Sequence, residues 1–130
     1  MRILLDTHYL LWSFIEPSRI QNKHRDYILS QENEVYFSQV SLWEISIKYN
    51  LGKLLLNGGH PEKLYEAIQN SFLLCKQIEN EELITFYKLS IAHRDPFDRL
   101  LIWQAINADM FLLSSDKRIG GYKKHGLKIL

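Results

Sequence analysis

Short apolar runs alternate with helix-forming segments along this chain, and the alternation restricts the folds open to it. The runs are residues 2–5 (RILL), 34–38 (EVYFS), 110–114 (MFLLS) and 127–130 (LKIL), and residues 72–78 could form a further strand. Apolar runs without polar alternation are typical of strands buried on both faces of a parallel sheet. Parallel strands need long crossover connections, which helices supply. We therefore predict an α/β fold of three layers, with a central parallel sheet flanked by helices.

The segments between these runs carry helix signals. We predict helices over residues 7–15, from Ser18 as N-cap to about Ser30, and over 41–50, 61–70 and 79–91, with a last one beginning at Pro96. Gly52 directly follows the third of these, where a left-handed residue ends a helix. A chain of 130 residues is most simply one domain, so residues 1–130 are expected to fold together.

Composition excludes several classes of protein. With 46% hydrophobic and 24% charged residues, the chain resembles an ordinary globular protein and not a disordered one. No apolar run approaches the roughly 20 residues that cross a bilayer, and the N-terminus lacks the pattern of a secretory signal. Cys75 is the one cysteine, so no internal disulfide can form. We expect a cytoplasmic protein without a membrane partner.

The net charge of +1 neither demands nor excludes a nucleic-acid partner, so a polyanion must be held by a local patch. The C-terminal segment offers one, although a solvated basic end is an equal alternative. Its basic residues are Lys117, Arg118, Lys123, Lys124, His125 and Lys128.

Four carboxylates fall near the ends of the predicted strands. Asp6 and Asp116 follow strands, whereas Glu44 and Asp98 lie in the first turns of helices next to strands. Ligands of open parallel sheets collect at the carboxyl ends of the strands, so we expect these acids to meet at one rim. Crowded anions repel one another, and a hard divalent cation such as Mg²⁺ or Mn²⁺ would remove the conflict. No Cys and His cluster has zinc spacing.

Each acid also has a structural alternative. Asp6 could N-cap the helix that begins at Thr7. Glu44 could be a buried acid paired with Lys48, one helical turn further on. Asp116 could be a turn residue before the basic segment that follows it.

The segment HRDPFDRLLIWQA (93–105) separates a cap from a site residue. Proline at the first helical position makes Asp95 the N-cap and Asp98 the third helical residue. Three and four residues beyond Asp98 lie Leu101 and Ile102, so Asp98 is on the buried side of the helix. We predict that Asp95 caps the helix and that Asp98 serves the site.

At these residues the sequence resembles PIN-domain ribonucleases, specifically the VapC-type toxins of bacterial and archaeal toxin–antitoxin pairs. The resemblance lies in LLDTHYLLW (4–12), SLWEISIKYNLGKL (41–54), HRDPFDRLLIWQA (93–105) and LLSSD (112–116), with residues 55–92 the least diagnostic. It implies a PIN fold and metal-dependent endonucleolytic cleavage of RNA that leaves 5′-phosphate and 3′-hydroxyl ends. It also implies a cognate antitoxin and a homodimer or toxin–antitoxin hetero-oligomer. The implied Mg²⁺ or Mn²⁺ ligands, and catalytic residues, are Asp6, Glu44, Asp98 and Asp116.

Other positions near the motifs leave their roles open. Thr7 matches a small hydroxyl residue of the family, which could bond a metal-bound water or merely pack. Arg94 and Arg99 could steady phosphates or face solvent or the antitoxin. Trp103 departs from the family pattern, which usually has a small residue there, and this bears on how the dimer or a neighbouring helix packs.

Two other classes compete with a nuclease. One is a catalytically inactive PIN-like module that binds RNA or a protein, against which the presence of all four acids argues. The other is a phosphoryl-receiving domain, which would want a pair of acids after the first strand, whereas only Asp6 follows RILL. The sequence does not identify which RNA would be cut.

Overall fold

The computed structural model describes residues 1–92 and 95–130, and the predicted alternation of strands and helices is present in it. The strands are β1 (Arg2–Leu5), β2 (Glu34–Ser38), β3 (Leu74–Lys76), β4 (Phe111–Leu113) and β5 (Lys128–Ile129). The α-helices are α1 (Thr7–Ile15), α2 (Asn22–Leu29), α3 (Gln39–Asn50), α4 (Pro61–Gln69), α5 (Asn80–Thr85) and α6 (Pro96–Ala108). Three 3₁₀ helices are η1 (Pro17–Arg19), η2 (Phe86–Lys88) and η3 (Lys117–His125).

The strands form one parallel sheet in the order β3-β2-β1-β4-β5, which confirms the predicted fold class. β1 lies at its centre, where Leu4 is in register with Tyr36 of β2 and with Leu112 of β4. Ile3, Leu4 and Leu5 are all 0% exposed. Because successive side chains of a strand point to opposite faces, both faces of the sheet must be covered.

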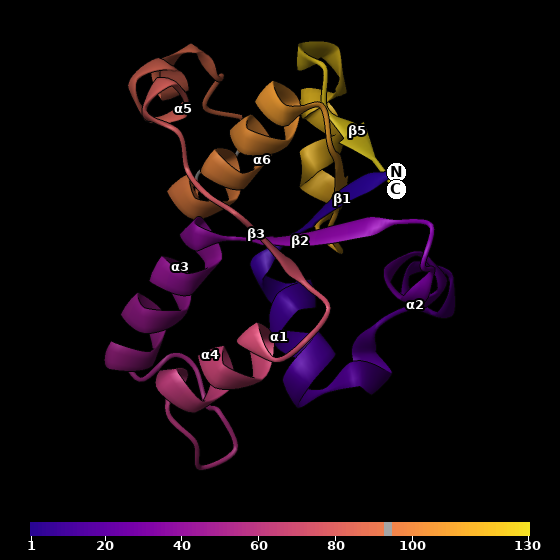
Figure 1. The fold of residues 1–130 in the computed structure, drawn as a ribbon. Coiled ribbons are helices and arrows are strands. Elements are labelled where there is room, and N and C mark those ends of the chain that lie inside the picture. The colour runs from indigo at the N-terminus through magenta and orange to yellow at the C-terminus, as the bar shows by residue number, and fades with distance from the viewer. Residues whose placement is uncertain (93–94) are drawn as a thin grey trace.

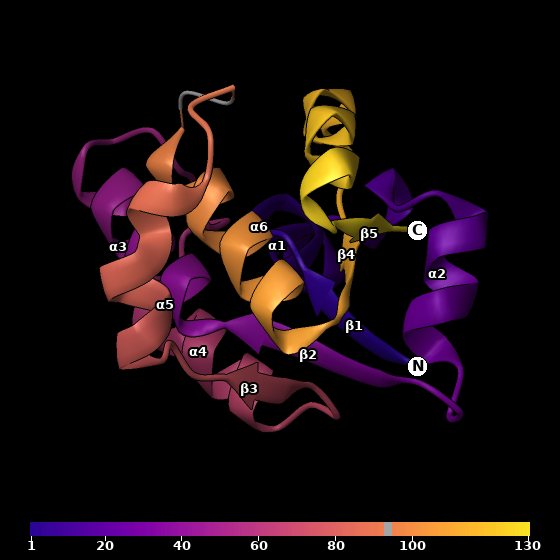
Figure 2. The same cartoon turned by 90° about the horizontal axis from the view of Figure 1, so that it is seen from above.

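Helices cover the two faces as separate layers (Figures 1 and 2). On one face, Leu4 packs with α6 and η3 residues such as Leu101 and Tyr122. On the other face, Ile3 and Leu5 pack with Tyr9 of α1 and with residues of α2. The carboxyl ends of β1 and β2 lead directly into α1 and α3, so both helices begin at the same edge of the sheet.

The prediction of a helix capped by Ser18 is wrong. Pro17–Arg19 form the single 3₁₀ turn η1, Ile20 is extended, and α2 begins at Asn22 with Gln21 as its N-cap. Ile20 is only 6% exposed and lies in the core with Tyr9 and Ile28. The backbone is extended at Ile20 so that its side chain reaches the core. A helix therefore cannot run through Ile20, and α2 begins after it.

The prediction of one helix over residues 79–91 is also wrong, for a similar reason. α5 ends at Thr85, η2 follows, and Leu89 is extended and 2% exposed, packed in the core cluster on the α6 face. The helical segment ends before Leu89 because the side chain of Leu89 packs into the core. η3 was not predicted: the segment 117–125, which carries most of the C-terminal basic residues, forms a 3₁₀ helix.

The predicted end of α3 at Gly52 is confirmed. Gly52 has φ +71°, and its N–H donates to the Tyr49 carbonyl at 3.1 Å. The N–H of Lys53 donates back to the Lys48 carbonyl at 2.9 Å. These two bonds are the Schellman arrangement, which turns the chain back along the helix. Among the described residues, no helix has the length and apolar character needed to span a bilayer.

Candidate active site

Asp6 lies buried at the carboxyl end of β1, with 5% of its surface exposed. Its Oδ1 accepts the Tyr9 N–H at 2.8 Å, so it N-caps α1, and its Oδ2 accepts the Ser114 hydroxyl at 2.6 Å. Burial raises the pKa of Asp6, and the negative charge of Glu44 adds to the rise. The hydrogen bonds from Ser114 and Tyr9 lower the pKa but do not cancel the effect of burial.

Glu44 in α3 is 1% exposed and has a partner for each oxygen. Its Oε1 accepts the Thr7 hydroxyl at 2.7 Å, and its Oε2 forms an ion pair with Lys48. The Thr7 oxygen also lies 2.9 Å from the Ser41 hydroxyl. Thr7 therefore binds the Glu44 carboxylate, and this hydrogen bond joins α1 to α3 at the edge of the sheet.

Asp6 and Glu44 are close enough for the charge of Glu44 to act on the Asp6 carboxyl group. Their neighbours in sequence are also in contact, since Thr7 follows Asp6 and binds Glu44. The structure therefore brings together two buried carboxylates that are 38 positions apart in the sequence.

Asp98 lies half-buried at the third position of α6, as the sequence indicates. The prediction that Asp95 caps this helix is confirmed, because its Oδ1 accepts the N–H groups of Phe97 at 2.9 Å and Asp98 at 3.4 Å. The charges of Asp95 and Asp98 both contribute to a raised pKa of Lys48, after the larger effect of Glu44. The N-terminus of α6 is therefore within electrostatic range of the Glu44–Lys48 pair.

Asp116 N-caps η3 and forms an ion pair with the Arg118 side chain. Its Oδ1 accepts the Arg118 N–H at 2.9 Å, and its two oxygens lie 3.0 and 2.9 Å from Nε and Nη2 of the same arginine. The Asp116 N–H donates to the Ser114 hydroxyl oxygen at 3.0 Å, and that hydroxyl donates to Asp6. A short chain of hydrogen bonds thus joins Asp116 to Asp6.

The electrostatic contacts of Arg118 extend further. Asp116 is the main cause of the raised pKa of Arg118, and the charges of Asp98 and Asp95 add to it. Asp98 therefore lies in range of two cations, Lys48 of α3 and Arg118 of η3.

The donor set can be tested against a divalent ion. Carboxylate oxygens supplemented by Thr7 and Ser114 hydroxyls are the donors that Mg²⁺ and Mn²⁺ prefer. Among residues 1–92 and 95–130, no group of three or more His, Cys, Asp or Glu side chains is arranged to hold a metal ion. Lys48 is paired with Glu44, and Arg118 with Asp116. The donors fit such an ion in kind, and an ion that binds them has to compete with these two cations.

The structure places the remaining candidates as follows. Arg94 lies outside the described residues. The Arg99 guanidinium lies over the Phe86 ring at 4.6 Å, and its buried Nε has no hydrogen-bond partner among the described residues. Trp103 donates to the Thr85 hydroxyl at 3.2 Å, so this departure from the family pattern packs α6 against α5.

Two hydroxyls near the acids were not predicted: Ser114 donates to Asp6, and Ser41 contacts Thr7, which donates to Glu44. Ser114 follows β4, and Leu113 of β4 is in register with Leu5, the residue before Asp6. The signal for Ser114 was its position one residue beyond β4, the strand next to β1. Ser41 lies three positions before Glu44, on the same side of a helix.

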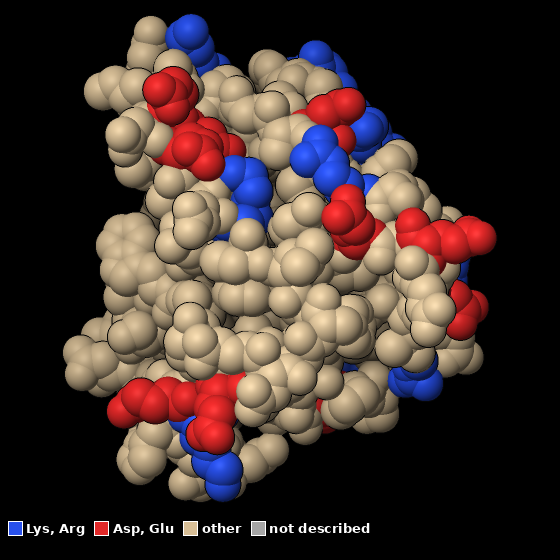
Figure 3. Space-filling model, in the orientation of Figure 1, with Lys and Arg blue, Asp and Glu red and all other residues tan. Residues whose placement is uncertain are grey.

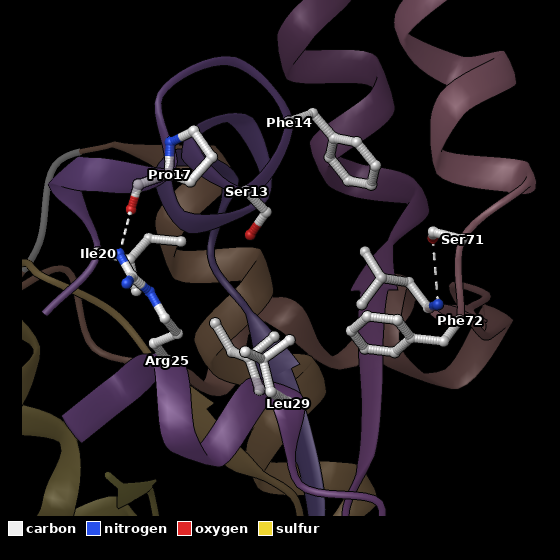
Figure 4. Close-up of a pocket in the computed structure, with 10 residues that line it drawn as sticks. Ser13, Phe14, Pro17, Ile20, Arg25, Leu29, Ser71 and Phe72 are labelled. Carbon is white, nitrogen blue, oxygen red and sulfur yellow. Dashed lines mark hydrogen bonds between the residues drawn. The ribbon is translucent and has the colours of Figure 1, made fainter. Parts of the chain in front are cut away.

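A cavity of about 280 Å³ opens beside the acids, between α1, α3 and the segment after α3. It is lined by Thr7, His8, Leu11, Glu44, Ile45, Lys48, Lys53 and Leu54. Another cavity, of about 240 Å³, lies against Phe14, Ile20, Leu29 and Phe72 and has no acid in its lining (Figure 4). On the face drawn in Figure 3, positive and negative side chains are intermixed, which agrees with a net charge near zero.

Solved structures with the same architecture include VapBC and FitAB complexes. VapBC2 from Rickettsia felis, bound to a promoter DNA fragment, superposes with a TM-score of 0.70 at 16% identity, covering 100% of this chain and 98% of that one. VapBC-1 from nontypeable Haemophilus influenzae gives 0.69 at 14% identity, over 100% and 97%. FitAcB from Neisseria gonorrhoeae gives 0.63 at 20% identity, over 98% and 96%. At these identities the similarity establishes the fold.

The family follows from the sequence itself. Among curated proteins, none matches the sequence significantly. The family model described as the PIN domain matches residues 3–124, a span that contains Asp6, Glu44, Asp98 and Asp116. This chain therefore belongs to the PIN domain family.

Proposed function

We propose that this protein is a Mg²⁺- or Mn²⁺-dependent endoribonuclease, a VapC-like toxin that hydrolyses phosphodiester bonds in RNA. The observation that carries the proposal is the pair of buried carboxylates, Asp6 and Glu44, at the carboxyl edge of the sheet. PIN domains are in general nucleases, which supports a hydrolytic role for such a pair. Asp98 and Asp116 complete the proposed set of metal ligands: the charge of Asp98 acts on Lys48 and Arg118, and Asp116 binds Arg118 and Ser114.

A bound divalent ion lowers the pKa of a water molecule and neutralises charge that develops on the phosphate. The protein's contribution is to fix the carboxylates beforehand. Ser114 and the Tyr9 N–H hold the two oxygens of Asp6, and Thr7 holds one oxygen of Glu44. Groups held in place in this way need little reorganisation when charge develops. Lys48 and Arg118 supply positive charge at the same edge, where a phosphate would approach.

The test is cleavage of a defined panel of transfer, ribosomal and messenger RNAs with Mg²⁺ or Mn²⁺, and with excess EDTA. We expect cleavage only with the metal, and loss of cleavage in Asp6→Asn and Asp98→Asn while both variants stay folded. Asp109→Asn is the matched control, because Asp109 is exposed at the end of α6 with φ +54°, a conformation that asparagine tolerates. Full activity of either site variant, or cleavage in EDTA, would contradict the mechanism.

The competing function is a PIN module that binds RNA or a protein without cutting. The ion pairs Glu44–Lys48 and Asp116–Arg118 favour it, since they neutralise two acids without a metal. Stoichiometric binding of RNA with no turnover at any metal concentration would decide for this alternative.

An antitoxin partner and a homodimer or hetero-oligomer, acting in the cytoplasm, belong to the same proposal. The structural neighbours named above are assemblies of toxins with antitoxins, which supports such a partner. Exposed apolar side chains support an interface near α3, α5 and η2: Trp43 is 60% exposed, Ile84 75% and Tyr87 79%. Light scattering of the protein alone tests for the homodimer. Light scattering with the product of an adjacent small reading frame tests for the complex with an antitoxin.

A further inference from the structure

The cavity between α1 and α3 shares a wall with the proposed catalytic acids. Thr7 and Glu44, which are hydrogen bonded to each other, line it directly. A strand of RNA whose phosphate lies at the acids therefore has this cavity as the space for a neighbouring nucleotide.

Two lysines line the cavity, and they differ in how their charge is used. Lys48, with 34% of its side chain exposed, is paired with Glu44. Lys53 is exposed and forms no ion pair with any residue that the structure describes. Lys53 is therefore the lysine in this lining that can attract an anion without giving up a partner.

The end of α3 holds Lys53 in this place. Because Gly52 adopts φ +71°, the chain turns back and the Lys53 N–H reaches the Lys48 carbonyl at 2.9 Å. The main chain of Lys53 is thus fixed beside the last turn of α3, close to Lys48 and to the wall made by Glu44. A lysine on a hydrogen-bonded turn loses less freedom on binding a phosphate than one on a loose loop.

Apart from the exposed His8, the rest of the lining is apolar. Leu11 of α1, Ile45 of α3 and Leu54 contribute hydrocarbon surface. A volume of about 280 Å³ is near the lower end of the roughly 300–1,000 Å³ of small-molecule pockets, so it suits a single base or nucleoside. Sites for single strands combine positive charge along the backbone with aromatic side chains on which the bases stack, and in this cavity the ring is that of His8, with aliphatic side chains beside it. The cavity of Figure 4 has apolar surface and one positive side chain, Arg25, but no acid lines it, so it does not adjoin the proposed catalytic residues.

We propose that this cavity is a subsite for the nucleotide next to the scissile phosphate of single-stranded RNA, and that Lys53 binds the phosphate of that nucleotide. The proposal rests on the proposed function, because it names the substrate subsite of the same acids.

The test measures binding of a fluorescent 10-nucleotide single-stranded RNA of randomised sequence as a function of salt, in EDTA so that nothing is cut. Each phosphate contact on a single strand contributes about 0.7 to the slope of log K against log salt. We expect Lys53→Gln to reduce this slope by about 0.7 and to weaken binding on the order of tenfold, as loss of one charged contact does. Lys53→Arg should keep both values, and Lys23→Gln, at an exposed lysine of α2, is the matched control.

A slope for Lys53→Gln equal to that of the unaltered protein would overturn the subsite. An equal reduction in Lys23→Gln would also overturn it, since binding would then be diffuse. RNA carrying 4-thiouridine gives a second measurement, and its photocrosslinks should map to the peptides of residues 8–11 or 53–54. Cleavage with Mn²⁺ is measured separately. An unchanged slope with cleavage intact refutes the subsite alone, whereas a reduced slope without cleavage supports the subsite and refutes the nuclease.

Discussion

The burial of Asp6 leads to an unusual expectation, that the charge of this proposed metal ligand opposes the stability of the fold when no metal is bound. Burial raises the pKa of Asp6 above its ordinary 3.8, so the folded protein disfavours the ionised form. Asparagine is as good an N-cap as aspartate, and its side chain can accept from the Tyr9 N–H and pair with the Ser114 hydroxyl. In EDTA at pH 7, Asp6→Asn should therefore match or exceed the unaltered protein in free energy of unfolding.

Asp6→Ala separates the charge from the hydrogen bonds. It removes the same charge, but it also loses the cap, worth about 1 kcal/mol, and leaves the Ser114 hydroxyl without its acceptor, at about 1–3 kcal/mol. The alanine variant should therefore be about 2–4 kcal/mol less stable than the asparagine variant. Urea unfolding of the three proteins, followed by tryptophan fluorescence, measures these differences.

The pH dependence of stability shows whether the Asp6 charge favours or opposes folding. In the unfolded chain Asp6 ionises near pH 3.8, and in the folded protein it ionises at a higher pH. As pH rises between these two values, the folded state keeps a proton that the unfolded state releases, so the stability of the unaltered protein falls. The advantage of Asp6→Asn should grow through this window and stay constant above it. An asparagine variant more than about 1 kcal/mol less stable than the unaltered protein at pH 7 would refute the reasoning.

Three further expectations follow from the same contacts. Lys48→Met should lower the free energy of unfolding by about 2–4 kcal/mol, because it leaves the charge of Glu44, whose side chain is only 2% exposed, without a partner. In thermal melts, Mn²⁺ should restore part of this lost stability. No recovery with Mn²⁺ would count against Glu44 as a metal ligand. Gly52→Ala should cost about 1 kcal/mol from its positive φ alone, since an added Cβ meets nothing within 4 Å, and Gly52→Asn should cost less in the same melts. Burial, with the charge of Lys23, lowers the pKa of His24, so stability should fall as pH drops below 6.5, and His24→Asn should flatten that dependence in melts at pH 5 and 7.5; an unchanged dependence would locate the effect elsewhere.

Local signals predicted the parts of the fold whose cause is local. The apolar run before Asp6, the proline at the start of α6 and the glycine after α3 each act within a few residues, and each is confirmed. The errors lie where distant contacts decide. Ile20 and Leu89 break helices because the core needs their side chains, and a helical pattern in the sequence does not record that need.

The candidate site divides in the same way. The sequence indicated the cap at Asp95 and the possible pairing of Glu44 with Lys48, because spacing along a helix fixes these. Contacts across elements were beyond it, such as Ser114 with Asp6 and Thr7 with Glu44. Those contacts depend on β4 lying next to β1 and on α1 and α3 starting at one edge.

By itself, then, the sequence determined which acids follow the strands and that Asp95 caps α6, since these properties depend on neighbours within one turn. Only the tertiary structure decided that the Ser114 hydroxyl reaches Asp6, that the Thr7 hydroxyl reaches Glu44, and that Asp6 and Glu44 keep only 5% and 1% of their surface exposed. The physical reason is that burial and charge pairing depend on distances through space, which the packing of α1, α3, α6 and η3 around the central strand sets.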